Sequence, residues 1–96
     1  PKVGFISRHI ASQNSWDDIR ASVVTFMKER QYELESENAQ TITFRYRSAA
    51  GKLTRMYEDR ITIVETPEGC EMEGLRKDVM KLAVGLEHRL NPLTEE

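Results

Sequence analysis

The sequence predicts an α+β fold, a two-layer sandwich in which an antiparallel meander of four or five strands is covered on one face by an N-terminal and a C-terminal amphipathic helix. Two observations support this prediction. Apolar residues recur at three-and-four spacing near both ends of the chain, which is the helical period, and between these segments apolar residues alternate with polar ones, which is the period of a strand. An antiparallel sheet with one apolar face needs a cover, and two helices with apolar stripes supply it.

The N-terminal helix is predicted to run from Trp16 to Glu29. Ser15 precedes it as an N-cap, and Asp17 and Asp18 lie at the positive end of the helix dipole. One helical stripe contains Trp16, Ile19, Val23, Phe26, Met27 and Arg30. We expect its apolar members in the core, with Trp16 as a lid. Residues 1–13 are predicted to form either an edge strand, over 2–10, or a flexible lead.

A β-hairpin is predicted for residues 31–47, QYELESENAQTITFRYR. If Glu37 pairs with Thr41 across a three-residue loop, Glu33 lies opposite Arg45. The inward residues of this register are Tyr32, Leu34, Phe44 and Tyr46. We therefore expect the acidic and basic side chains, Glu33, Glu35 and Glu37 among them, to form the solvent face, with the N-terminal helix on the other side.

The second half of the chain continues the sheet and ends in a helix. A strand is predicted over 52–57, with a turn, a bulge or a continuation at 58–59, and further strands over 60–65 and 70–73 are joined by a turn at 66–69. The C-terminal helix begins at Leu75 and carries a stripe of leucines and a valine to Leu90. Gly85 inside this helix indicates close packing, and residues 91–96 are expected to be a flexible tail.

Size and composition indicate one soluble globular domain, residues 1–96. The chain has 96 residues, a formal net charge of -2 and no long apolar run, so we expect no membrane insertion by this chain itself. It begins at Pro1 without an initiator methionine, so we expect either a fragment of a longer protein or a chain that has lost its first residue. Cys70 has no second cysteine for an internal disulfide, which favours the cytoplasm, with a tether to a membrane by a segment outside this chain as a further expectation.

The residues needed for catalysis or metal binding are not found together in the sequence. One cysteine and two histidines, His9 and His88, predict no metal site. Cys70 alternates with Glu71 and Glu73 and is interpreted as a core residue, and no glycine pattern for holding phosphate occurs. We therefore expect no enzyme and no cofactor.

Basic residues on the middle strands form the candidate binding set. Arg45, Arg47, Lys52 and Arg55 are predicted to form a basic strip able to hold phosphate or carboxylate groups. Arg76, Lys77 and Lys81, at the start of the C-terminal helix, form a second patch. The alternative is that carboxylates on facing strands neutralise the strip without any ligand.

The order helix, strands, helix resembles that of the double-stranded RNA-binding domain. Arg76, Lys77 and Lys81 occupy the region where that family places its lysines. The resemblance covers the order of elements only, since GLRKDVMKLAVGL lacks the family's Lys-Lys pair followed by small residues, and it implies no activity here. The stretch YEDRITIVETPEGCEMEGLRKDVMKL also resembles soluble domains attached to small bacterial membrane proteins.

The sequence supports two hypotheses about function. The first is a non-catalytic interaction or regulatory domain that binds a protein partner or forms a homodimer, because a charged outer sheet face and terminal edge strands can pair with another chain. The alternative is weak binding of nucleic acid or an anionic ligand through the basic strand face.

Overall fold

A computed structural model describes residues 4–47 and 60–92, and it confirms the predicted α+β class: five antiparallel strands in one sheet and two helices. In chain order the elements are β1 (Phe5–Ala11), α1 (Trp16–Glu29), β2 (Tyr32–Glu37), β3 (Thr41–Tyr46), β4 (Arg60–Thr66), β5 (Gly69–Leu75) and α2 (Arg76–Leu90). The predicted strand over 52–57, with Lys52 and Arg55, lies outside the described residues, as do residues 93–96 of the predicted tail.

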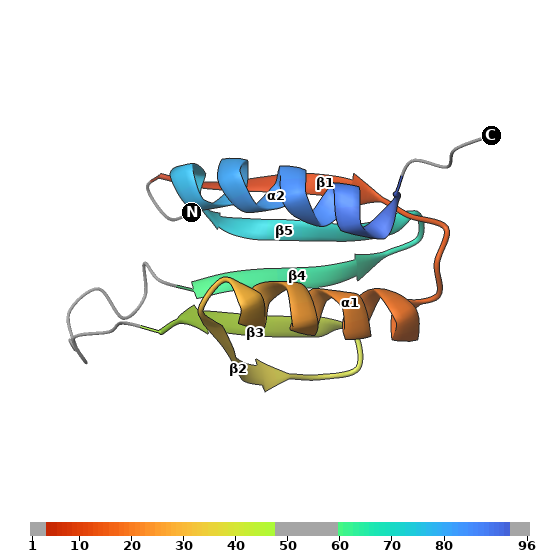
Figure 1. The fold of residues 1–96 in the computed structure, drawn as a ribbon, viewed down its shortest axis with the longest axis horizontal. Helices are drawn as coiled ribbons and strands as arrows, with labels where there is room; N and C mark the ends of the chain where they lie inside the picture. The colour runs from red at the N-terminus through yellow and green to blue at the C-terminus, as the bar shows by residue number, and fades with distance from the viewer. Residues whose placement is uncertain (1–3, 48–59, 93–96) are drawn as a thin grey trace.

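The strand order in the sheet is β1-β5-β4-β3-β2, with every neighbouring pair antiparallel. The meander is therefore β2 to β5, and β1 joins it beside β5. Residues Phe5–Ala11 form an edge strand, so the edge-strand prediction is confirmed and a wholly flexible lead is wrong. The two helices lie next to each other on one face of the sheet (Figure 1), which makes two layers.

Local signals in the sequence explain where each helix begins and which side it buries. The Ser15 hydroxyl accepts a hydrogen bond from the backbone N–H of Asp18 at 3.2 Å, as an N-cap does. The buried side of α1 consists of Ile19, Val23, Phe26 and Met27, and that of α2 of Val79, Leu82, Ala83, Leu86 and Leu90. Both predicted stripes are thus confirmed as core except at Leu75, which ends β5, precedes α2 and is only half-buried. Trp16 is partly buried against that core.

The two helices meet at Phe26 and Gly85. A Cβ atom added at Gly85 would lie 3.0 Å from Cζ of Phe26, so the glycine allows the ring to approach, which confirms the predicted close packing. The guanidinium of Arg30 lies 3.6 Å from the centroid of the same ring, a cation-π contact. Arg89 of α2 donates to Glu29 of α1 at 2.7 Å and thereby joins the helix surfaces.

The hairpin of β2 and β3 follows the predicted register only in its first half. Tyr32 pairs with Tyr46, Glu33 with Arg45 and Leu34 with Phe44, as predicted. A bulge between Leu34 and Ser36 then shifts the register by one residue, so Glu37 pairs with Ile42 and not with Thr41. The predicted pairing of Glu37 is therefore wrong.

The bulge also moves the side chain of Glu37 to the other face of the sheet. Because its partner Ile42 is fully buried beneath the helices, Glu37 lies on the helix-covered face, where Arg20 of α1 donates to it at 2.9 Å. The prediction that Glu33, Glu35 and Glu37 share the solvent face holds for the first two and is wrong for Glu37.

Two of the four residues predicted to be inward in the hairpin are only half-buried. Phe44 and Tyr32 are 1% and 7% exposed, which confirms their assignment to the core, whereas Leu34 and Tyr46 are each 44% exposed, so for them it is wrong. All four lie on the helix-facing side, but β2 is an edge strand and Tyr46 ends β3. β2 lies outside the area of the sheet that the two helices cover (Figure 1).

Candidate functional site

The predicted basic strip is met by carboxylates on the outer face of the sheet. Nε of Arg47 lies 3.3 Å from Oε2 of Glu33. Arg45 stands between Glu33 and Arg60 in the sheet register. The structure thus places Arg45 and Arg47 together, as predicted, but beside acids that reduce the positive charge offered to a ligand.

The best-formed ion pair on this face joins β4 to the bulge of β2. Arg60 donates from Nε and from a terminal nitrogen to the two oxygens of Glu35, at 2.6 and 2.7 Å, in the two-pronged arrangement that suits arginine and a carboxylate. These hydrogen bonds, with the charges of Arg60 and Arg45, lower the pKa of Glu35. On the helix side, the hydrogen bonds from Arg20 likewise lower the pKa of Glu37.

The second predicted patch, at the start of α2, is divided by the structure. Lys77 and Lys81 line a pocket of about 540 Å³ together with Arg30, Tyr32 and Tyr46, whereas Arg76 does not line it. This pocket lies between the C-terminal end of α1 and the first turns of α2. Sequence reasoning missed Arg30 and Tyr46 because they come from separate elements, and only folding brings them to the lysines.

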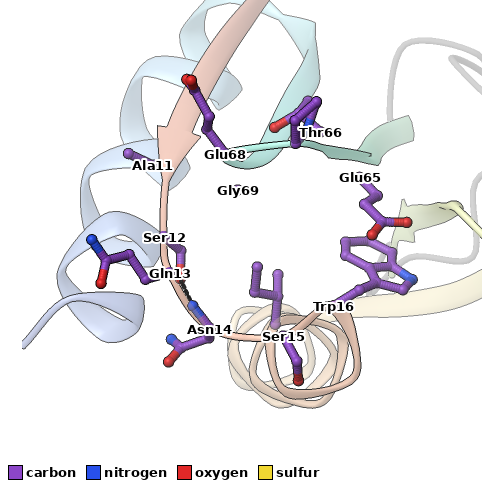
Figure 2. A pocket seen from close by; sticks show the side chains of 12 residues that line it. Ala11, Ser12, Gln13, Asn14, Ser15, Trp16, Glu65, Thr66, Glu68 and Gly69 are labelled. Carbon is purple, nitrogen blue, oxygen red and sulfur yellow. Dashed lines mark hydrogen bonds between the residues drawn. The ribbon is translucent and has the colours of Figure 1, made fainter.

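A pocket of about 600 Å³ lies at the opposite end of the sheet, between the β4–β5 turn and the start of α1 (Figure 2). The side chain of Glu65 points toward the indole of Trp16, and Ser12 lies across the pocket from these two residues. Some of its polar groups are used within the protein: the Ser12 hydroxyl accepts from the backbone N–H of Asn14, and the Asn14 side chain donates to the carbonyl of Leu90. The side chains of Glu65 and Glu68, which also line this pocket, have no hydrogen bond or ion pair within residues 4–47 and 60–92.

The chemistry of Cys70 is that of a core thiol. The residue is fully buried, and burial raises the pKa of its thiol to about 11, so it is protonated at neutral pH. Within 4–47 and 60–92, no three histidine, cysteine or acidic side chains are grouped as a metal site would require.

The open edge of β1 has a simple backbone pattern. The N–H of Arg76 donates to the carbonyl of Gly4 and the N–H of Ser12 to that of Glu68, and both pairs continue the β1–β5 register. Hydrogen-bonded pairs alternate along an antiparallel ladder, so even-numbered residues of β1 bond to β5. Ser7 and His9 consequently direct their N–H and C=O groups away from β5, toward the open edge.

The two edges of the sheet differ in how they are protected. β2 has the bulge at Glu35 and exposes three glutamates, features that discourage pairing with another strand. β1 pairs with β5 without a register shift along Phe5–Ala11, so it presents a regular seven-residue strand. Of the two described edges, β1 is the one that a further strand can extend.

An apolar strip on α2 lies beside this edge. Met80 and Val84 are 46% and 59% exposed, and they are four positions apart in the sequence, so they lie on one side of the helix. Arg8 of β1 reaches Met80, with a guanidinium nitrogen 3.8 Å from the sulfur. The sequence contained a signal for this strip, since both residues are apolar and fall outside the leucine stripe.

Comparison of the chain with known protein families, with curated proteins and with solved structures finds no match. The fold and the sites define a small two-layer α+β domain with one regular open edge and one basic pocket. Over the part of the chain that the structure describes, neither helix combines the length and the apolar character needed to cross a bilayer.

Proposed function

We propose that this chain is a non-catalytic interaction domain that self-associates through β1, with the β1 strands of two copies pairing antiparallel to make one continuous sheet. The observation that carries this proposal is the difference between the edges: β2 is bulged and acidic, whereas β1 is regular and lies beside exposed Met80 and Val84.

The direction of α2 favours a second copy as the partner. Arg76 bonds to Gly4 at one end of β1, and the Asn91 side chain bonds to the carbonyl of Ala11 at the other, so α2 runs parallel to β1. A twofold axis that makes two β1 strands antiparallel therefore makes the two α2 helices antiparallel as well. Met80 of each copy then faces Val84 of the other.

Charges on α2 suit the same arrangement. With the axis midway between Met80 and Val84, position 87 of one helix is level with position 77 of the other. Glu87 and Lys77 carry opposite charges, and both are exposed. Each copy thus supplies an acid and a base in complementary places, which a symmetric pair needs.

The interface is small, so we expect a weak dimer. One strand pair and two apolar side chains per copy place it at the low end of specific interfaces, with a dissociation constant of roughly 1 to 100 μM. A buried, unpaired thiol is compatible with a reducing compartment, and we place the domain in the cytoplasm.

Proline substitution tests the edge separately from the fold. Ser7→Pro removes an N–H that points to the open edge, so we expect a monomer whose thermal stability is nearly unchanged, because proline is tolerated on the open side of an edge strand. The matched control is Arg8→Pro, which removes an N–H bonded to β5 and should destabilise the fold itself. Val84→Lys should also give a folded monomer.

Sedimentation equilibrium and circular dichroism melts of the four proteins provide the readouts. A wild-type chain that stays monomeric up to about 1 mM, far above the expected dissociation constant, would overturn the proposal. A Ser7→Pro variant that still dimerises would show that another surface is used.

A further inference from the structure

The pocket between the end of α1 and the start of α2 brings together positive charge and exposed aromatic surface. It measures about 540 Å³, which lies within the range of small-ligand pockets. Its side chains come from both helices and from the paired strands β2 and β3. Its charged and aromatic side chains, among the described residues, are those of Arg30, Tyr32, Tyr46, Lys77, Asp78 and Lys81.

The charge of this pocket is less neutralised than that of the outer sheet face. Among residues 4–47 and 60–92, neither Lys77 nor Lys81 has an ion-pair partner, whereas Arg47 and Arg60 are paired with glutamates. Arg30 donates to the carbonyl of Phe26 and lies 3.4 Å from Glu29, so it is held in position at the rim. Three cations and one acid, Asp78, leave the described lining with net positive charge.

The two tyrosines supply a firm aromatic surface. Tyr32 is buried, and its ring meets that of Tyr46 edge to face, with 5.3 Å between ring centroids. This contact holds the Tyr46 ring, which is nevertheless 44% exposed and lines the pocket. A flat ligand ring can therefore stack against Tyr46 at a low cost in side-chain entropy.

From this geometry we propose that the pocket binds a mononucleotide, with its phosphate on Lys77 and Lys81 and its base against Tyr46. Lysine ammonium groups are suited to phosphate, and stacking on an aromatic ring holds a base of any identity. Arg30 adds charge at the rim, and the Asp78 carboxylate is placed to accept a hydrogen bond from an amino or hydroxyl group. This site shares Lys77 with the proposed dimer interface, whereas Lys81, Arg30 and Tyr46 take no part in that interface.

The test uses AMP, adenosine and inorganic phosphate as probes, at low and at moderate salt. Amide chemical shifts in ¹⁵N-labelled protein locate each probe, and titration gives its affinity. We expect AMP to shift amides around Tyr46 and Lys81, and to bind more weakly as salt increases because its phosphate contact is electrostatic. Adenosine and phosphate should each bind more weakly than AMP, since each lacks half of the contacts.

Variants separate the two halves of the site. Lys77→Gln with Lys81→Gln should lower AMP affinity at least tenfold and leave adenosine binding nearly unchanged. Tyr46→Ala should lower AMP affinity roughly fivefold or more, as expected for loss of base stacking, with little change for phosphate. Arg47→Gln, on the opposite face, is the matched control and should change neither affinity more than about twofold, as for an exposed cation outside the site.

Three outcomes would overturn this proposal. The first is that AMP shifts amides of the outer face around Arg45 and not those of the pocket, and the second is that AMP binds the double lysine variant as tightly as it binds Arg47→Gln. The third is that duplex RNA binds while AMP does not, which would assign these cations to a polynucleotide surface.

Discussion

The hairpin of β2 and β3 offers a sharp test of which residues are in the core, because Leu34 and Phe44 lie directly opposite each other on the same face. Phe44 is 1% exposed, so Phe44→Ala removes a fully buried ring and should cost roughly 3 to 5 kcal/mol. Leu34 is 44% exposed. Full burial of a leucine contributes about 1.5 to 3 kcal/mol, so Leu34→Ala should cost only about 1 kcal/mol.

Urea denaturation followed by circular dichroism measures both changes. With a slope of about 1 to 1.5 kcal/mol per molar urea for a domain of this size, Phe44→Ala should lower the midpoint by roughly 2 to 5 M and Leu34→Ala by about 1 M or less. Arg45→Ala, on the outer face, is the control and should cost under about 1 kcal/mol. If Leu34→Ala or Arg45→Ala proved as damaging as Phe44→Ala, the inside and outside of this hairpin would have been assigned incorrectly.

Two further predictions concern a turn and an ion pair. Gly69→Ala should cost about 3 kcal/mol or more. Gly69 has a φ of +148°, and an added Cβ would collide with the Ile10 carbonyl and come within 2.8 Å of the Ser12 nitrogen. The control is Gly4→Ala, which should cost about 1 to 2 kcal/mol in urea melts, because Gly4 has a φ of +82° but an added Cβ would meet only the Leu75 side chain, at 3.6 Å. Pairing with Arg60 lowers the pKa of Glu35 in the folded protein, so its stabilising effect is present above the pKa of an unfolded glutamate and is lost as the pH falls through the folded value. Wild type should therefore exceed Glu35→Gln in stability at neutral pH, by under about 1 kcal/mol, and this difference should disappear once the pH has fallen below the lowered pKa of Glu35; a difference that stays constant with pH would contradict the assigned role of the carboxylate.

Elements with strong local signals were predictable from the sequence. The helix Trp16–Glu29 agrees with its predicted bounds because its cap, Ser15, and its apolar spacing are properties of neighbouring residues. The hairpin register from Tyr32 to Leu34 was also predictable, since alternation decides which side chains share a face. Lys77 and Lys81 were recognised as a patch because both belong to one helix.

Tertiary structure decided what depends on contacts between distant segments. Alternation places Leu34 and Tyr46 on the helix-facing side, but only the extent of the helical cover leaves them half-exposed. The bulge turns Glu37 toward Arg20, an interaction across the two layers that period-two alternation does not encode. Sequence spacing likewise says nothing of β1 lying beside β5, or of Arg30 and Tyr46 meeting Lys77 and Lys81, because such contacts arise only when the whole chain packs around one core.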